Sequence, residues 1–272
     1  MEKNLWVSWK DIYSKNSGGA ENVTHNILNK ISSKNHRFIL VSPKQKGLKK
    51  IQKEKNYIIF RPSFIFFLPF YLIFFSRIKK INLSIEEINT FHFFTKLLLK
   101  CKNKKIFIHQ LTEIVWFYEI NIIFSLLGFI YEKVSLRLLK NIEIITISNS
   151  TKNNLINNGL IENKIKIIPQ LINFIDNKYP KKKYNNDNIK LFYFGSLRKM
   201  KNVDFLINTF KDLSFRNNNY EFNIITNDTI NAKKIKKKYF KIKKLNFLIS
   251  KNLKDLHYTL NLQDIFPLQW MN

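Results

Sequence analysis

Cysteine is almost absent from this chain of 272 residues, which contains a single one, Cys101. One cysteine excludes an internal disulfide framework, and it excludes zinc and iron–sulfur sites that need several thiolates. A chain without disulfides suits a reducing compartment. The cysteine content therefore predicts a cytoplasmic protein.

Acidic residues are also scarce. The 19 aspartates and glutamates stand against 47 lysines and arginines, which gives a formal net charge of +28. Such a charge attracts phosphate-rich partners, namely nucleic acid, anionic lipid or a nucleotide. A second explanation stays open, because Lys, Asn, Ile and Phe are encoded by codons of A and T alone. A genome rich in A and T would then account for much of the excess lysine without selection for a ligand.

Long hydrophobic runs are missing as well. The most apolar stretch, residues 64–75 (FIFFLPFYLIFF), is interrupted by Pro69 and is shorter than the roughly 20 residues of a membrane-spanning helix. The chain start, with Glu2 and Lys3, predicts no secretion signal. We expect no transmembrane helix. Residues 64–75 form either a buried helix or an interfacial segment, and the lysine clusters at 181–183 and 233–244 are solvated faces or contacts for anionic lipid.

Apolar residues, by contrast, are abundant: 45% of the chain is hydrophobic and 15% is aromatic. This content excludes a globally disordered chain. At roughly 150 residues per domain, the length predicts two α/β lobes.

The first part of the chain alternates short apolar strands with helices. Residues 5–8 indicate a strand, the turn at 16–19 (NSGG) opens a helix over 20–32, and residues 37–41 indicate the next strand. Strand, glycine turn, helix and strand make a βαβ unit, which favours a parallel sheet. Further strands are expected at 57–60, 83–85, 106–109, 142–147 and 165–169, and helices at 117–139 and 149–157.

Residues 173–190 lose this periodicity and fill with Lys, Asn and Asp, as an exposed linker does. A second series follows, with strands at 191–194 and 221–226 and helices at 203–213 and 230–241. The sequence thus predicts an N-terminal domain over 1–175, a linker over 176–189 and a C-terminal domain over 190–272. The last of these has room for only about half of a doubly wound sheet.

Several short segments carry a recognisable pattern. They are residues 8–11 (SWKD), 17–21 (SGGAE), 85–90 (IEEINT), 108–111 (IHQL), 115–119 (VWFYE), 145–151 (ITISNST) and 194–197 (FGSL), the last followed by Lys201-Asn202. In this order and spacing they resemble glycosyltransferase family 4, over residues 6 to about 210.

The resemblance implies the GT-B fold, an α/β architecture of two Rossmann-like lobes with parallel sheets, the second incomplete here. It implies that Gly18 and Gly19 border the sugar-nucleotide cleft. From the residues alone, this turn is either a phosphate cradle at a helix N-terminus or a tight turn that binds nothing.

The resemblance also implies a donor-phosphate loop, with donor contacts at Gly195, Ser196, Arg198 and Lys201. The Lys201 ammonium would neutralise a diphosphate leaving group. Ser196 stands where family members commonly carry arginine, and a serine cannot clamp phosphate as a bidentate cation does. Arg198 is the expected substitute.

Two residues are predicted to be catalytic, His109 and Glu87. His109 ends an apolar strand, which places it at the carboxyl edge of a parallel sheet, where an imidazole can bind a sugar hydroxyl or move a proton. A purely structural histidine is the alternative. By resemblance, its position matches a family histidine close to the transferred sugar. Glu87 also directly follows an apolar strand.

Other polar residues have simpler interpretations. Glu86 and Glu113, like Glu87, are acid–base or acceptor-binding candidates, and Glu119 falls in the aromatic cluster at 116–118. A carboxyl group in so cationic a chain usually just pairs with a surface lysine. Ser148 and Ser150 indicate helix caps. Leu171 stands where the family usually has glycine, so the cleft there is expected to differ.

The activity that the resemblance implies is a hexosyltransferase-type glycosyltransferase. It would move a sugar from a nucleotide-diphosphate donor to a saccharide or lipid-linked acceptor in cell-surface polysaccharide or glycoconjugate biosynthesis, with retention and without cofactor or metal. The expected partners are this donor, this acceptor and an anionic membrane surface, but no nucleic acid. The expected location is the cytoplasm, including the inner face of the membrane.

Two alternatives stay open. Family members continue with a Glu-x7-Glu segment that holds the donor, and residues 267–272 end without it, which predicts weak or absent transfer by this chain alone. An inactive, truncated remnant is therefore the first alternative. A basic nucleic-acid-binding protein is the second, against which the sequence shows no zinc-finger spacing, RRM motif or basic region joined to heptads.

Overall fold

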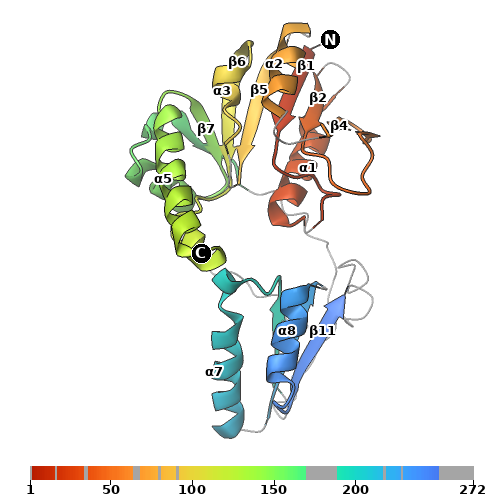
Figure 1. Cartoon of the computed structure of the whole chain (residues 1–272), viewed down its shortest axis with the longest axis vertical. Helices are drawn as coiled ribbons and strands as arrows, with labels where there is room; N and C mark the ends of the chain where they lie inside the picture. Colours follow the sequence, from red (N-terminus) through yellow and green to blue (C-terminus); the bar gives the residue numbers. More distant parts are fainter. Residues whose placement is uncertain are drawn as a thin grey trace. The chain divides into compact units, whose positions relative to one another are not determined.

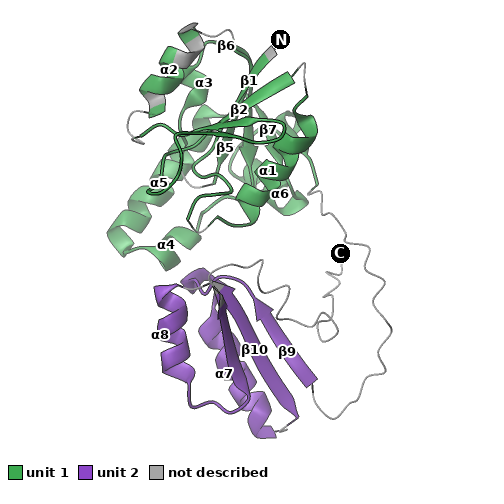
Figure 2. Ribbon diagram, turned by 90° about the vertical axis from the view of Figure 1, so that its right-hand side faces the viewer, with its two compact units in different colours: residues 1–173 green, residues 174–272 purple. Residues whose placement is uncertain are grey.

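The computed structural model describes residues 2–15, 17–33, 36–63, 68–78, 81–89, 92–169, 189–216, 219–227 and 229–250. The chain divides into two compact units, residues 1–173 and 174–272 (Figure 2). Each unit is described by itself. Of the sequence-based interpretations, the linker at 176–189 apart from its last residue, the lysines at 181–183, Leu171 and residues 251–272 lie outside the described residues.

Unit 1 is built on one eight-stranded sheet with the strand order β3-β4-β2-β1-β5-β6-β7-β8 (Figure 1). All neighbouring strands are parallel except β3 and β4, which are antiparallel. The strands are β1 (Glu2–Val7), β2 (His36–Val41), β3 (Ile51–Lys53), β4 (Ile58–Phe60), β5 (Ile81–Ile88), β6 (Cys101–Ile108), β7 (Glu143–Thr146) and β8 (Ile165–Ile167).

The strand order reverses between β1 and β5. From β1 the chain moves outward to β2 and then β4, and it then returns to place β5 on the other side of β1. A crevice at the carboxyl ends of the strands, at such a reversal, is where open α/β sheets bind their ligands. The topology of unit 1 therefore singles out the carboxyl ends of β1 and β5.

Helices pack on both faces of this sheet. Alternate side chains of β1 point to opposite faces, so that Trp6 packs with Leu28 of α1 whereas Leu5 packs with Leu72 of α2. The helices of unit 1 are α1 (Gly19–Ile31), α2 (Leu68–Ile78), α3 (Thr95–Leu98), α4 (Val115–Glu119), α5 (Ile122–Leu138) and α6 (Asn149–Asn157).

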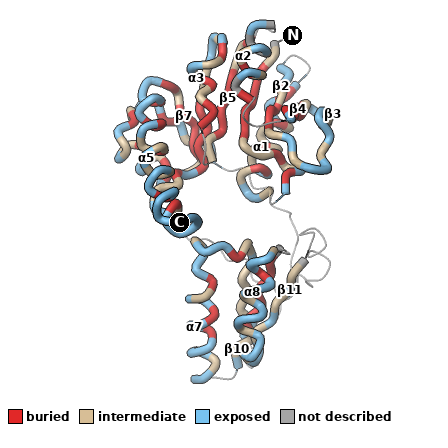
Figure 3. Tube along the Cα trace, viewed as in Figure 1, coloured by how far each residue is buried: buried red, intermediate tan, exposed pale blue. Residues whose placement is uncertain are grey.

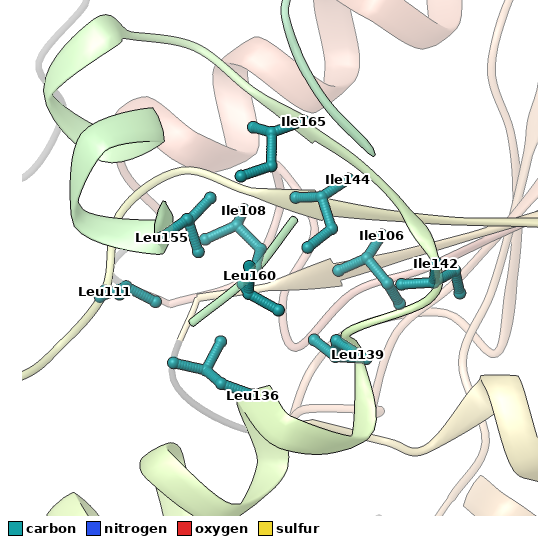
Figure 4. Close-up of a cluster of buried hydrophobic side chains, with 10 residues drawn as sticks. All are labelled: Ile106, Ile108, Leu111, Leu136, Leu139, Ile142, Ile144, Leu155, Leu160 and Ile165. Carbon is teal, nitrogen blue, oxygen red and sulfur yellow. The ribbon is translucent and has the colours of Figure 1, made fainter. Parts of the chain in front are cut away.

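A third cluster of buried side chains fills the space between β6, β7, β8 and the helices α5 and α6 (Figure 4). Leu136 and Leu139, at the end of α5, point toward Ile106 and Ile144 of the sheet. The C-terminal end of α5 is thus fastened to the sheet by apolar contacts.

Unit 2 is a smaller parallel sheet of three strands in the order β11-β10-β9. Its elements are β9 (Ile189–Phe194), α7 (Val203–Arg216), β10 (Tyr220–Asn227), α8 (Ile230–Tyr239) and β11 (Leu245–Ser250). Ile207 and Phe210 of α7 and Ala232 of α8 pack with Phe222 and Ile224 of β10.

The structure corrects one predicted helix and adds strands that the sequence did not indicate. The helix expected over 117–139 is interrupted, because Asn121 adopts an extended conformation and its side chain caps α5 by accepting a hydrogen bond from the Phe124 amide at 3.1 Å. Strands β3 and β11 were not predicted. Their residues are partly exposed, and each contains a polar residue such as lysine or asparagine, so neither forms an uninterrupted apolar run.

The apolar stretch at 64–75 is described from residue 68 onward, where it forms α2. Leu68 and Leu72 are buried in the core, whereas Phe70 and Phe74 are exposed. Pro69 lies in the first turn, where a missing amide hydrogen is tolerated. Within the described residues, no helix combines the length and the hydropathy that crossing a bilayer requires.

The loop after β1 is held by a buried ion pair. Arg61 donates from Nε to Oδ2 of Asp11 at 2.7 Å and from Nη2 to Oδ1 at 2.9 Å, and both side chains are fully buried. Burial pushes the pKa of Asp11 upward, but hydrogen bonds from Arg61, Ser42 and the Tyr13 amide outweigh it and hold that pKa below its ordinary value. This pair fixes the chain just before the glycine turn.

Helices α4 and α5 approach closely at Gly128. A Cβ atom added to Gly128 would lie 2.6 Å from the Trp116 ring, a distance that real Cβ atoms do not reach. The Trp116 indole also donates to Glu132 Oε2 at 3.2 Å. Gly128 and Glu132 of α5 therefore hold the α4 indole in place.

We expect Gly128→Ala to lower the free energy of unfolding by about 1–2 kcal/mol, because the displaced Trp116 ring outweighs the better helix propensity of alanine. Chemical denaturation measures this difference. Leu127→Ala, at an exposed neighbour on the same helix, serves as the control and should change stability by less than about 0.5 kcal/mol. Equal stabilities of the two variants would contradict the close contact.

Candidate functional site

The Glu87 side chain lies at the carboxyl end of β5, beside the strand reversal. It is fully buried, unlike the lysine-paired surface glutamate that is usual in a cationic chain. Its carboxyl group accepts four hydrogen bonds. Oε2 accepts from Trp6 Nε1 at 2.8 Å and from Thr24 Oγ1 at 2.7 Å, and Oε1 accepts from Asn89 Nδ2 at 3.2 Å and pairs with His109 Nε2 at 3.0 Å.

These donors come from different elements of unit 1. Trp6 is in β1, Thr24 is in α1, and His109 directly follows β6. One carboxyl group thus joins three neighbouring strands and the helix that follows the glycine turn. Sequence reasoning missed Trp6, Thr24 and Asn89. The position of the polar Thr24 on the apolar stripe of its helix was the one available signal of a buried polar contact.

His109 is held in a fixed orientation. Nε2 is the ring nitrogen that faces Glu87 Oε1, and Nδ1 is the ring nitrogen that Glu87 does not hold. The ring packs edge-on against Phe107, with centroids 4.7 Å apart, and the His109 carbonyl accepts from Thr151 Oγ1 at 3.0 Å. The structure therefore brings the two predicted catalytic residues, Glu87 and His109, into direct contact.

The glycine turn caps α1. Gly18 is the N-cap residue, and its amide donates to the Glu21 carboxyl at 2.6 Å. A Cβ atom on Gly19 would meet nothing within 4 Å, so Gly19 leaves open space beside the first turn of the helix. Through Thr24, the same helix is tied to Glu87. Gly18 and Gly19 thus open the helix that supports the Glu87–His109 pair.

The predicted donor loop lies in unit 2, after β9. Gly195 adopts a φ of +154°, which favours glycine, and its amide donates to the Ile225 carbonyl at 3.1 Å. Tyr193 donates to the Ser196 carbonyl at 3.0 Å. The loop therefore has a defined conformation at the carboxyl end of a parallel strand.

Arg198 and Lys201 project from this loop. Both are exposed; Arg198 immediately precedes a short 3-10 turn over Lys199–Lys201 that leads into α7, and Lys201 is the last residue of that turn. Neither side chain forms an ion pair with an acidic residue in the described part of the chain. Two cations just before a helix N-terminus suit a bound anion.

Glu86, the neighbour of Glu87, is buried on the other face of β5 and was not recognised as a structural anchor. Its carboxyl accepts from the amides of Phe93 and Thr95 and from Thr95 Oγ1. Burial raises the pKa of Glu86 to about 7, and burial together with the Lys96 charge lowers the pKa of His92 to about 4. His92 Nε2 lies 3.5 Å from Glu86 Oε1.

The remaining candidates are structural or peripheral. Glu113 accepts from Asn158 Nδ2 at 3.0 Å, Glu119 is exposed, and Ser148 caps α6 by accepting from the Thr151 amide at 3.1 Å, as predicted. Ser150 does not cap this helix; it lies in its first turn.

A hollow of about 510 Å³ lies between α8 and β11 in unit 2 and contains none of the predicted site residues. Among the residues that the structure describes, no group of three or more His, Cys, Asp or Glu side chains is arranged to hold a metal ion.

Comparison with solved structures shows the fold. A structure of the lipopolysaccharide outer core galactosyltransferase WaaB aligns over 97% of this chain and 72% of its own, with a TM-score of 0.59 and 12% identity. The S. aureus MnaA–UDP structure aligns over 95% and 72%, with a TM-score of 0.52 and 9% identity. The overall class is therefore the GT-B fold of two Rossmann-like lobes, with the smaller sheet in the second.

A third similar structure is described as trehalose-6-phosphate from E. coli bound with UDP-2-fluoro glucose. It aligns over 91% of this chain and 73% of its own, with a TM-score of 0.53 and 9% identity. No curated protein matches the chain.

The family model of glycosyltransferase family 4 matches residues 17–174, more than half of the chain. The chain belongs to this family, and the resemblance seen in its motifs is confirmed. The match begins at the glycine turn and includes both Glu87 and His109.

The opposed shifts of Glu86 and His92 predict a pH dependence of folding. Folding raises the pKa of Glu86 from 4.5 to about 7, so the Glu86 contribution to the free energy of unfolding falls as pH rises through that window. Folding lowers the pKa of His92 from 6.5 to about 4, so the His92 contribution rises with pH between these values. In the wild type the two contributions oppose each other. We expect Glu86→Gln to leave only the rise, on the order of 2 kcal/mol between pH 5 and pH 6.5.

Urea denaturation at several pH values measures this rise. Glu113→Gln, at a partly exposed carboxyl, is the matched control and should keep the wild-type pH dependence. A Glu86→Gln profile parallel to that of the wild type would show that the Glu86 carboxyl does not titrate in this range.

Proposed function

We propose that the chain is a hexosyltransferase that moves a sugar from a nucleotide-diphosphate donor to a saccharide or lipid-linked acceptor, with retention of configuration. The observation that carries this proposal is the Glu87–His109 pair, because it lies at the strand reversal of a family 4 lobe and is supported by the helix that follows the glycine turn.

The donor is expected to bind through its diphosphate. UDP is present in the similar MnaA structure and a UDP-sugar analogue in the E. coli structure, which supports a nucleotide-sugar ligand for this fold. In unit 2 the cations Arg198 and Lys201, just before the N-terminus of α7, have the polarity that phosphate needs. We propose that they offset the phosphate charge without metal or cofactor.

In the transfer step, the bond between the sugar C1 and the diphosphate oxygen breaks, the acceptor hydroxyl oxygen forms the new bond at C1, and the hydroxyl proton passes to the departing diphosphate oxygen. Arg198 and Lys201 would stabilise the charge that builds up on the leaving diphosphate. His109 would contact the transferred sugar through Nδ1, the ring nitrogen that Glu87 does not hold. Glu87 is fully engaged with its four donors, so we assign it the positioning of His109.

The acceptor is expected to belong to cell-surface polysaccharide or glycoconjugate synthesis on the cytoplasmic side of the membrane. The galactosyltransferase of lipopolysaccharide outer core among the similar structures supports this class of acceptor. A lipid-linked acceptor also fits the net charge of +28, since the protein would work beside anionic lipid.

We expect the purified chain to bind UDP, and Arg198→Ala and Lys201→Ala each to weaken this binding about 10–100-fold, because each removes a charge-assisted hydrogen bond to phosphate. Isothermal titration with UDP and GDP measures the affinities. Lys211→Ala, at an exposed lysine of α7, should bind like the wild type. Loss of binding in EDTA would contradict a metal-free site, and equal affinities of all variants would contradict the proposed donor loop.

We expect His109→Ala to lower the turnover of nucleotide sugar by about 100-fold or more while changing its Kd less than about 10-fold, because the ring acts on the reacting sugar. Donor hydrolysis, with water as a slow acceptor, gives both quantities. Glu87→Gln should lower turnover in the same way but less. Nucleotide binding without any turnover in the wild type would instead identify an inactive chain that has kept its binding site.

A further inference from the structure

Helix α5 has an unusual distribution of side chains, with apolar residues on its exposed side. Together with α4 and its flanking residues it leaves twelve large apolar side chains between 39% and 69% exposed. Figure 3 shows much of α5 in the colour of exposed residues. We call this set of twelve side chains the α4–α5 apolar face. It consists of Ile114, Phe117, Tyr118, Ile120, Ile122, Ile123, Phe124, Leu126, Leu127, Ile130, Val134 and Leu138.

The inner side of α5 buries Leu136 in the core and, beside it, polar groups that are hydrogen-bonded. Ser125, Glu132 and Ser135 are buried there. Ser125 donates to the Trp116 carbonyl at 2.8 Å, and Glu132 accepts from the amides of Thr112 and Glu113 at 2.6 and 2.7 Å. Turning the helix to hide its apolar side would leave these groups without partners, which buried polar groups rarely tolerate. The apolar side is therefore fixed outward.

The size of this face exceeds what a protein normally leaves in water. Twelve half-exposed side chains amount to on the order of 1,000 Å² of apolar surface, whereas monomers expose patches of a few hundred Å². Helices α4 and α5 make the patch continuous, since the Phe117 and Phe129 rings lie 6.1 Å apart. Such a face calls for an apolar partner.

The charges around the face indicate the kind of partner. None of the exposed residues of α5 is acidic, and Arg137 and the following Lys140 are exposed at its C-terminal end. Lys96 reaches the same end, where its ammonium donates to the Leu138 carbonyl at 2.7 Å. Glu119, on α4, is the exposed acid at the opposite end. An apolar surface bordered by cations matches an anionic bilayer, whose acyl chains lie beneath negative headgroups.

A second copy of the chain fits the face less well. Two chains of net charge +28 would repel each other. We propose that the α4–α5 apolar face docks the protein on the surface of an anionic lipid bilayer, with the apolar side chains entering the headgroup boundary and Arg137 and Lys140 contacting lipid phosphates.

The proposed membrane contact is a different surface from the aromatic stretch at 64–75, which the sequence suggested as an interfacial segment. In its described part, α2 exposes Phe70 and Phe74 but buries Leu68 and Leu72. Docking on a bilayer would bring the protein to a lipid-linked acceptor, so the biological purpose of the α4–α5 apolar face rests on the proposed function. Vesicle binding itself needs neither donor nor transfer, so the two proposals fail separately.

Flotation with vesicles of equal parts phosphatidylglycerol and phosphatidylcholine tests the docking face. We expect the full chain to bind these vesicles, to bind pure phosphatidylcholine vesicles more weakly, and to be partly released near 1 M salt, where the Debye length falls to about 3 Å. The triple variant Ile123→Ser, Leu127→Ser, Ile130→Ser should bind about 100-fold more weakly, because three apolar side chains no longer insert.

Two matched variants locate the contact. Phe70→Ser with Phe74→Ser removes the exposed aromatics of α2, and Phe205→Ser with Phe215→Ser does the same on α7; both should bind vesicles like the wild type. Circular dichroism verifies folding, and all substituted residues are exposed. Titration with UDP on each variant reports the donor site independently, so lost vesicle binding with intact UDP binding refers to the face alone.

Three results would overturn the proposal. The first is that the wild type does not bind anionic vesicles. The second is that the triple variant binds as well as the wild type, or that the α2 variant loses binding in its place. The third is a wild-type dimer in sedimentation that the triple variant converts to a monomer, which would assign the face to a second copy.

Discussion

A carboxyl group removed from water must be supplied with hydrogen-bond donors, and the way Glu87 meets this requirement determines the geometry of the candidate site. Its donors Trp6, Thr24 and His109 belong to β1, α1 and the end of β6, so none of these elements can move away without leaving a buried polar group unpaired. The strand reversal, the helix after the glycine turn and the His109 ring therefore form one rigid arrangement. Rigidity of this kind is what a catalytic imidazole needs.

The same constraint recurs along the carboxyl edge of the sheet. Asp11 fixes the loop after β1 through Arg61, Glu86 fixes the segment after β5 through the Thr95 amide, and Glu132 fixes the loop after β6 through the Thr112 amide. Each of these carboxyls is buried. In a chain with 19 acidic residues, several thus act inside the fold and are not available to pair with surface lysines.

The fold was largely accessible from the sequence, because the βα alternation, the glycine turn and the buried strands leave local signals. The contact between Glu87 and His109 was only partly accessible. Both follow apolar strands, which predicts their position at the sheet edge, but their pairing depends on β5 and β6 being neighbours, and strand order is not a local property. The break between α4 and α5 was missed, since Asn121 lies within an apolar run and acts only through its cap. The sequence named Glu86 as an acid–base candidate, but the structural roles of the buried Glu86 and Glu132 were not predicted, because the donors they bind include backbone amides, which no residue type reveals.

The docking proposal and the site are connected through Glu132. The chain runs from His109 directly into the loop that carries Thr112 and Glu113, and the amides of both are held by Glu132 on the inner side of α5. The outer side of the same helix is the α4–α5 apolar face. If α5 lies on a bilayer, the loop after His109 is held at a fixed distance from the lipid surface, because a single buried carboxyl links the two. On this proposal, a lipid-linked acceptor would meet His109 without a large movement of unit 1.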